Sequence, residues 1–130
     1  MARNQTDHPT ESELEILRIL WTKGPSTVRD VHEVLSKTRR VGYTGILKLM
    51  QNMAEKGLVT RDENQRSHIY STHLREEQTQ RRLVKELLQS AFSGSADKLV
   101  MQALEAKKVT AQELSEIRRM IEELESRQKE

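Results

Sequence analysis

Hydrophobic residues recur at helical spacing in the first third of the chain, in two runs separated by a break. The first run follows Thr10 and Glu13, whose spacing is that of a capping box, and it stops at Gly24. The second run starts at Ser26 or Thr27 and has one apolar stripe, formed by Val28, Val31, Val34 and Leu35. These patterns predict two short helices joined by a tight turn.

The middle of the chain predicts a third helix followed by a β-hairpin. Apolar residues keep a helical spacing over residues 43–56, and Gly57 stands where a left-handed C-cap favours glycine. Two β-like runs follow at 58–62 and 67–72, separated by the polar residues 63–66. A polar, turn-prone segment between two short strands is typical of a hairpin.

After residue 74 the apolar pattern changes. A doubled stripe, typical of a helix that packs on two sides, is formed by Leu83, Val84, Leu87, Leu88, Ala91 and Phe92. A Ser-Gly-Ser break at 93–95 leads to a second stripe, and a capping-box pattern at Thr110 opens a last helix. That helix has a coiled-coil-like seam of Leu114, Ile117, Ile121 and Leu124. Three such helices favour a dimerisation region, with folding back onto the first half of the chain as the alternative.

Three helices followed by a two-stranded hairpin is the order of a winged helix-turn-helix. The expected fold is therefore mostly α with a small β-hairpin wing: an N-terminal winged helix-turn-helix and a C-terminal helical dimerisation region. We expect a DNA-binding domain over residues 1–74 and a helical dimerisation domain over residues 75–130. The expected dimer contacts are Leu83, Leu87, Leu88, Phe92, Leu99, Leu104, Leu114, Ile117, Ile121 and Leu124.

Composition and charge sharpen this interpretation. The chain has 130 residues, of which 35% are hydrophobic and 3% aromatic, so we expect a partner chain to supply part of the buried surface. The formal net charge is only +2. Residues 37–61, however, hold six basic residues and one acid, whereas residues 75–130 hold eleven of each. The local basic excess indicates an anionic partner, with a solvated helical bundle as the alternative.

The third predicted helix has an apolar and a polar face on a helical wheel. Ile46, Leu49, Met50 and Met53 share the first face, and Thr44, Lys48, Gln51, Asn52 and Glu55 share the second. Asn and Gln amides pair bidentately with adenine, and a Lys ammonium reaches guanine or a phosphate. We therefore expect the polar face to read base edges in the major groove. Gly45 either allows close approach of the backbone to DNA or is simply a poor helix former near the end of the helix. Arg39 and Arg40 stand just before this helix, where phosphate contacts set the register. Arg66 is at the tip of the predicted hairpin, the place for a minor-groove or backbone contact.

Other functional classes receive little support. The chain has no cysteine, which removes disulfides, thiolate metal sites and cysteine nucleophiles. It has no Gly-rich phosphate loop and no Ser-His-Asp pattern, so we expect no enzyme and no cofactor. The four histidines are dispersed, which disfavours a metal-responsive repressor. No apolar run approaches the roughly 20 residues of a membrane span, and residues 1–13 lack a hydrophobic signal core. The expected protein is soluble and cytoplasmic, without a membrane partner.

Several stretches carry a family resemblance. ELEILRILWTKGPSTVRDVHEVL (13–35), GYTGILKLMQNMAEKGLVTR (42–61) and RSHIYS (66–71) resemble the BlaI/MecI penicillinase-repressor family of winged-helix transcription regulators. ADKLVMQALEAKKVTAQELSEIRRMIEEL (96–124) is similar to that family's C-terminal dimerisation segment, so the resemblance covers nearly the whole chain. The Leu-Trp-x-x-Gly-Pro turn and the Tyr-Thr start of the third helix are its most specific marks.

The resemblance implies a homodimeric repressor that binds a palindromic operator on double-stranded DNA. By matching positions, Tyr43, Thr44 and Lys48 belong to the recognition helix, and Arg66 and His68 to the wing. His68 departs from the aromatic residue that this family more often has there. The residues implied by the resemblance and the polar residues found on the helical wheel together give the expected DNA-binding set: Arg39, Arg40, Tyr43, Thr44, Gly45, Lys48, Gln51, Asn52, Arg66 and His68.

The resemblance also raises the question of a regulatory protease as a partner. In the best-known members a membrane sensor-protease cuts an Asn-Phe bond in the C-terminal segment. The matching positions here are Gln102 and Ala103, and neither side chain fits that pattern. We therefore expect repression without Asn-Phe-type processing. A winged helix that serves only as a protein-interaction module is the main alternative to a DNA-binding repressor.

Overall fold

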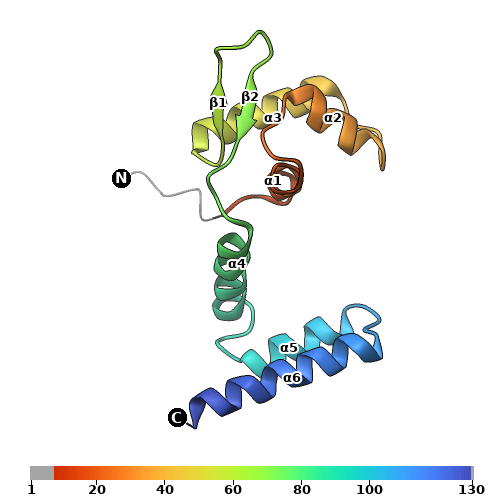
Figure 1. Ribbon diagram of the computed structural model, residues 1–130, viewed down its shortest axis with the longest axis vertical. Helices are drawn as coiled ribbons and strands as arrows, with labels where there is room; N and C mark the ends of the chain where they lie inside the picture. The colour runs from red at the N-terminus through yellow and green to blue at the C-terminus, as the bar shows by residue number, and fades with distance from the viewer. Residues whose placement is uncertain (1–7, 130) are drawn as a thin grey trace. The chain divides into compact units, whose positions relative to one another are not determined.

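The computed structural model describes residues 8–129. Residues 1–7 and 130, which belong to the two expected domains, lie outside the described part. So does much of the N-terminal segment, residues 1–13, in which we expect no signal core. The elements are α1 (Glu11–Lys23), α2 (Val28–Ser36), α3 (Tyr43–Lys56), β1 (Thr60–Asp62), β2 (Ile69–Ser71), α4 (Glu76–Ser90), α5 (Ala96–Glu105) and α6 (Ala111–Gln128) (Figure 1). Over residues 8–129 the chain is thus mostly helical with one small hairpin, which confirms the expected fold class.

Contacts between residues divide the chain into two compact units, Met1–Lys85 and Glu86–Glu130. The division falls inside α4, later in the chain than the expected domain boundary after residue 74. A division by contacts does not test which segment folds alone, so the boundary between a DNA-binding and a dimerisation domain stays a prediction.

Local capping signals fix where the first two helices begin. The Glu13 amide donates to Thr10 Oγ1 at 3.2 Å, and the Thr10 amide donates to Glu13 Oε1 at 2.8 Å. Thr27 and Asp30 form the same reciprocal pair at 3.0 Å each way, so Thr27 is the cap of α2. The backbone hydrogen bond from Thr27 holds the pKa of the Asp30 carboxyl below its usual range. Each box satisfies two amides that a helix start otherwise leaves unpaired.

The expected C-cap of α3 is also present. Gly57 has φ 85° and ψ 8°, the left-handed conformation that glycine adopts without a steric penalty, and its amide donates to carbonyls of the last turn. Ile46, Met50 and Met53 of α3 are buried, as the apolar face of the wheel predicts, and Leu49 is half-buried. They join one core made by α1, α2, α3 and the base of the hairpin.

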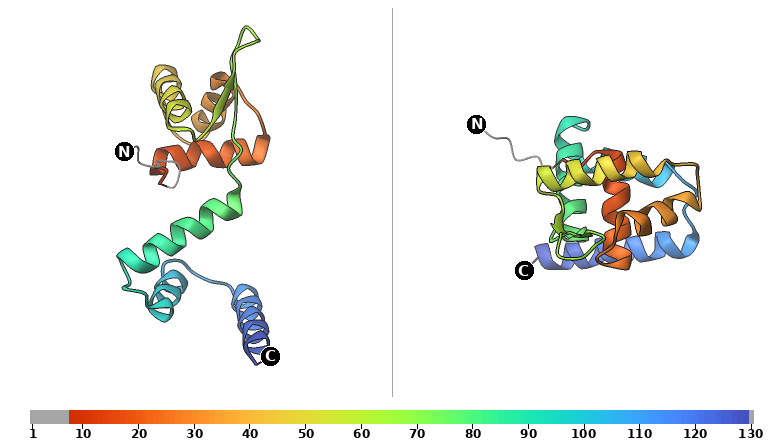
Figure 2. Two further views of the ribbon diagram at one scale, coloured as in Figure 1. Left: turned by 90° about the vertical axis from the view of Figure 1, so that its left-hand side faces the viewer. Right: turned by 90° about the horizontal axis from the view of Figure 1, so that it is seen from above.

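The hairpin is shorter than the sequence predicts. Strands β1 and β2 pair antiparallel over three residues each, in the register Thr60↔Ser71, Arg61↔Tyr70 and Asp62↔Ile69. The predicted first strand, 58–62, starts later because the Leu58 amide donates to the Met53 carbonyl at 2.9 Å and the Leu58 carbonyl accepts from the Thr72 hydroxyl at 2.7 Å, so neither group joins the ladder. Likewise residues 67 and 68 belong to the turn. The hairpin extends beyond the helices of this unit (Figures 1 and 2).

A third segment that the sequence did not predict completes the base of the wing. The Ser26 amide donates to the Tyr70 carbonyl at 2.9 Å, and the Tyr70 amide donates to the Ser26 carbonyl at 2.8 Å. Both residues are almost fully buried. The turn between α1 and α2 is therefore joined to β2, so the wing is fixed to the helix-turn-helix rather than hanging from one end of α3.

Two long-range contacts fix α1 against the rest of this unit. Lys56 Nζ, in the last turn of α3, donates to Glu13 Oε1 at 2.9 Å and to Glu13 Oε2 at 2.7 Å. Trp21 Nε1 donates to the Leu74 carbonyl at 2.9 Å, just before α4. Glu13 is only 3% exposed, so its pair with Lys56 joins the start of α1 to the end of α3 away from most solvent.

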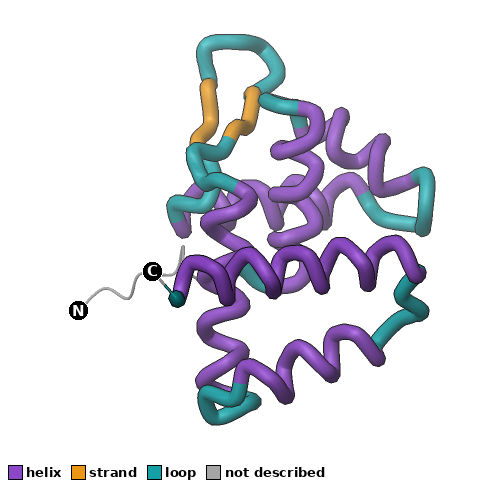
Figure 3. The backbone as a smooth tube through the Cα atoms, turned by 60° about the horizontal axis from the view of Figure 1, so that its bottom comes forward, coloured by secondary structure: helices purple, strands orange, loops and turns teal. Residues whose placement is uncertain are grey.

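The second unit contains the end of α4, α5 and α6. Ser93 (φ 50°) and Gly94 (φ 84°) make the expected break between α4 and α5, and Thr110 caps α6 by accepting from the Glu113 amide at 3.0 Å. Helices α5 and α6 run in opposite directions (Figure 3). Over residues 86–129 no side chain is buried. Among the described residues, no helix combines the length and apolar composition that crossing a membrane requires.

Candidate nucleic-acid interface

The outward face of α3 holds most of the predicted base-reading residues. All six predicted positions of this helix are exposed: Tyr43, Thr44, Gly45, Lys48, Gln51 and Asn52. Within residues 8–129, no side-chain hydrogen bond or ion pair engages Lys48, Gln51 or Asn52. Their ammonium and amide groups are therefore free for an external partner, which is the state that base recognition requires.

Gly45 stands in open space on this face. Apart from its chain neighbours and the backbone of its own helix, no atom lies within 4 Å of the place where a Cβ would stand. Packing inside the protein therefore does not require a glycine there, and glycine in a helix interior costs about 0.5–1 kcal/mol relative to alanine.

Arg39, a predicted phosphate contact, pairs with an acid of α1. Its guanidinium forms a two-point pair with Glu15 of α1, in which Nη2 donates to Oε1 at 2.8 Å and Nη1 donates to Oε2. Hydrogen bonding to Arg39 lowers the pKa of the Glu15 carboxyl, and the same pair raises the pKa of Arg39. Arg40 is exposed. The phosphate contact predicted for Arg39 would thus require it to share or leave Glu15, whereas Arg40 makes no such pair within the described part of the chain.

His32 of α2 is a residue near this face that the sequence reasoning missed. Its Nε2 lies 2.9 Å from the Val41 carbonyl oxygen, and because a carbonyl only accepts, Nε2 carries the proton and donates. The His32 ring also meets the Tyr43 ring edge-on, with centroids 5.7 Å apart and planes at 69°. His32 therefore holds both the lead-in to α3 and its first residue. Its position in the sequence does not distinguish it from a surface histidine.

In the wing, Arg66 is the arginine available to a partner. Arg61 is held inside the hairpin: its pKa is raised by a hydrogen bond with Tyr70 and by Glu63, whose Oε2 lies 2.8 Å from Arg61 Nε. Arg66 and His68 are exposed in the turn between the strands. Among residues 8–129, Arg66 makes no hydrogen bond or ion pair.

A hollow joins the wing to the helix-turn-helix, and we call it the α2–wing cleft. It has a volume of about 340 Å³ and is lined by Thr27, Val28, Arg29, Tyr43, Arg66, Ser67 and His68. It brings together Tyr43, Arg66 and His68, which the sequence predicted, with Thr27 and Arg29, which it did not. Lys48, Gln51 and Asn52 lie further along α3 and are not part of the cleft.

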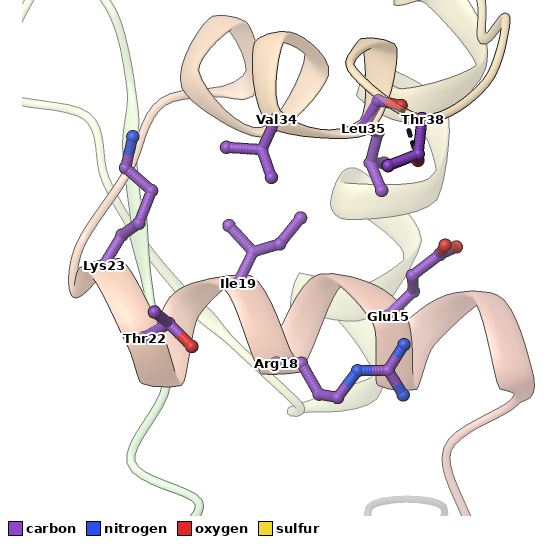
Figure 4. A pocket seen from close by; sticks show the side chains of 8 residues that line it. All are labelled: Glu15, Arg18, Ile19, Thr22, Lys23, Val34, Leu35 and Thr38. Atoms are coloured by element: carbon purple, nitrogen blue, oxygen red, sulfur yellow. Dashed lines mark hydrogen bonds between the residues drawn. The ribbon is translucent and has the colours of Figure 1, made fainter.

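A second hollow lies between α1 and α2 (Figure 4). Figure 4 shows Ile19 pointing from α1 toward Val34 of α2, with Arg18 on the α1 side and Thr38 donating to the Leu35 carbonyl at 3.3 Å. Ile19 is 8% and Leu35 5% exposed, so the floor of this hollow offers little apolar surface to a ligand. We assign no ligand to it.

The predicted dimer residues lie on helices α4, α5 and α6. In the single chain Leu87, Leu114, Ile121 and Leu124 are 40–51% exposed, and the other six are half-buried: Leu83, Leu88, Phe92, Leu99, Leu104 and Ile117. Exposed leucines and isoleucines repeated along short helices leave apolar surface in water, which is unfavourable unless a partner covers it. No group of three or more potential metal ligands occurs in residues 8–129.

Helices α1 to α3, followed by a two-stranded hairpin whose base packs in the same core, define a winged helix-turn-helix protein. The chain belongs to the penicillinase repressor family, whose profile matches residues 9–123. This confirms the resemblance to the BlaI/MecI regulators, and the family makes the chain a transcriptional repressor.

Individual relatives agree with this assignment. The chain is similar to the transcriptional regulator BlaI of Mycobacterium tuberculosis, with 35% identity over 116 residues that cover 88% of this chain and 83% of that protein. It is similar to the penicillinase repressor of Bacillus licheniformis, with 22% identity over 93% of this chain and 94% of that protein. It is also similar to the methicillin resistance regulatory protein MecI of Mammaliicoccus sciuri, at 20% identity over 91% and 96% of the two chains.

Proposed function

We propose that this repressor acts as a homodimer that binds a palindromic operator on double-stranded DNA, with α3 reading base edges in the major groove. The observation that carries the proposal is the outward face of α3, where Lys48, Gln51 and Asn52 are exposed and have no partner within the described residues. The opposite face of the same helix is buried in the core, so the helix has only one orientation in which to meet DNA.

The residues of the interface divide into two kinds of contact. Lys48, Gln51 and Asn52 are suited to base edges because their donors and acceptors match guanine and adenine in the major groove. Arg40 and Arg66 flank α3 and are suited to phosphates, which position the protein without reading sequence. The pair of Arg39 with Glu15 holds the loop before α3 against α1.

A homodimer follows from the reach of one recognition helix. A single α3 covers a short half-site, and two copies must stand about 34 Å apart to read two half-sites one helical turn from each other. We propose that residues 75–130 hold the two copies together, and that residues 1–74 bind DNA. The exposed apolar residues of α4, α5 and α6 support the dimerisation role of the C-terminal segment. Because α4 spans both compact units, it is the physical link between them.

We propose that release from the operator does not depend on cleavage of an Asn-Phe bond. Gln102 and Ala103, the matching residues, lie inside α5 and are exposed. A protease binds an extended substrate, so cleavage there would require α5 to open first. Another protease specificity, or another signal, would then release the repressor.

The test is to incubate the purified protein with fragmented genomic DNA, recover the bound fragments and identify the sites by sequencing. A salt titration of binding to a recovered site follows. The proposal predicts enrichment of a palindrome and binding that weakens steadily as salt rises, because bound phosphates release counterions. Absence of any enriched DNA would favour a protein-interaction module and contradict the proposal.

A further inference from the structure

Two arginines from distant parts of the chain face the α2–wing cleft. Arg29 belongs to the first turn of α2, and Arg66 belongs to the turn of the wing. Ser67 adds a hydroxyl group on the wing side, and none of the seven lining residues is acidic. Thr27 also lines the cleft, but its hydroxyl is engaged with Asp30 in the cap of α2. A cleft lined by two arginines, a hydroxyl donor and no carboxylate is complementary to an anion with several oxygen atoms.

The nearby acids do not neutralise this cleft. Asp30 is turned to the cap of α2, where its Oδ2 accepts from the Thr27 amide at 3.0 Å. Glu33 pairs with Arg29 at 3.6 Å, but their side chains are 63% and 81% exposed. An exposed pair at that distance contributes little to stability, so Arg29 can exchange Glu33 for another anion at small cost.

Tyr43 relates the cleft to the recognition helix. It is the first residue of α3 and also lines the cleft, so the cleft adjoins the end of α3 that enters the major groove first. A DNA strand that borders the groove read by α3 would therefore pass over the cleft. Its phosphates are the anions that such a strand presents at that edge.

We propose that the α2–wing cleft binds one backbone phosphate in each operator half-site, held jointly by Arg29 and Arg66 with the hydroxyl of Ser67 as a further donor. This inference rests on the proposed DNA-binding function and assigns Arg29 and Ser67, which neither the sequence pattern nor the family resemblance identified. Because one phosphate bridges α2 and the turn of the wing, binding would hold that turn against α2, in addition to the contact between Ser26 and Tyr70 at the base of the wing.

The test uses the full-length protein and an operator duplex recovered from genomic DNA. Each phosphate of one half-site is replaced, one at a time, by an uncharged methylphosphonate, and affinity is measured by fluorescence anisotropy. Wild type should lose about tenfold or more at the phosphate in the cleft, the scale of a lost hydrogen bond to a charged group. The Arg29→Ala/Arg66→Ala double variant should show no loss at that phosphate and the wild-type loss at every other one.

The salt dependence gives a second readout. The slope of log K against log salt is negative, and each neutralised phosphate adds about 0.9 to its magnitude. If both arginines share one phosphate, the double variant should reduce that magnitude by about 0.9 per half-site. Two separate phosphates would give twice that reduction. The Arg29→Lys/Arg66→Lys variant keeps both charges and should retain the wild-type slope, which separates loss of charge from loss of fold. Arg18→Ala is the matched control, because Arg18 lines the other hollow (Figure 4) and its loss should leave the methylphosphonate profile unchanged.

Three outcomes would overturn the inference. The double variant could keep every methylphosphonate penalty, it could lose the penalty at two separate phosphates, or Arg18→Ala could change the profile as much as the double variant does. In each case operator binding by the wild type would still stand, so the proposed function would survive. If the protein recovers no DNA, the proposed function fails and this inference fails with it.

Discussion

The pair between Glu13 and Lys56 makes a quantitative prediction about what holds the recognition helix in place. Glu13 is 3% exposed and accepts two hydrogen bonds from Lys56 Nζ, at 2.9 and 2.7 Å. Lys56→Met keeps most of the side-chain length but leaves the buried carboxylate without its cation. Breaking a buried pair in this way costs about 3–5 kcal/mol, and we expect about 3 kcal/mol because the Lys56 side chain is still 24% exposed.

The assay is urea unfolding followed by the fluorescence of Trp21, the one tryptophan of the sequence. Trp21 lies in α1 and donates to the Leu74 carbonyl, so its signal reports on the unit that contains α3. Lys56→Met should lower the free energy of unfolding by about 3 kcal/mol, and Glu13→Gln by about 1–2 kcal/mol because the amide still caps α1. The double variant should cost less than the sum, since no unpaired charge is then buried.

Lys48→Met is the matched control, because it makes the same chemical change on the exposed face of α3. It should alter the free energy of unfolding by no more than about 0.5 kcal/mol. If Lys56→Met is as mild as Lys48→Met, or if the two changes at the pair add without coupling, the Glu13–Lys56 contact does not hold α3 and the reasoning is refuted.

Three further predictions concern binding and assembly. Lys48→Ala or Asn52→Ala should each cost about 1–3 kcal/mol of operator affinity and relax preference at particular base pairs in a binding-site selection; unchanged preference would mean that α3 meets DNA on another face. Leu87→Asp with Ile121→Asp should give monomers by light scattering, since each places a charge in the proposed interface; a stable dimer would contradict the assignment. His32→Leu should weaken DNA binding about tenfold, whereas His32→Gln, which still donates to the Val41 carbonyl, should stay nearer to wild type; equal losses would assign His32 a packing role only.

Local features of the fold were predictable because short segments encode them. Thr10 and Gly57 mark a helix start and a helix end through groups only a few residues away, and both act as the sequence predicts. The two faces of α3 follow from the 3.6-residue period, so the buried and exposed sets were predictable too. The hairpin was located correctly, but its first strand is shorter because the backbone of Leu58 bonds the end of α3 and the Thr72 side chain instead of the ladder.

Contacts between distant residues were not predictable from the sequence. Glu15 pairs with Arg39, Ser26 pairs with Tyr70, and Arg29 and Arg66 line the same cleft. Each pairing depends on the angles at which the helices and the wing pack, and no local period encodes those angles. Arg39 illustrates the consequence, since its position before α3 suggested a phosphate contact while its guanidinium is held by α1.

The central claim, that two copies of α3 read a palindrome in the major groove, is tested most directly by dimethyl sulfate protection of the selected operator. The reagent methylates guanine N7 in the major groove and adenine N3 in the minor groove, so it reports which groove is occupied. Bound full-length protein should protect guanine N7 in two symmetric half-sites whose centres lie about 34 Å apart. Protection confined to one half-site, or a bound operator with every guanine N7 still reactive, would contradict it.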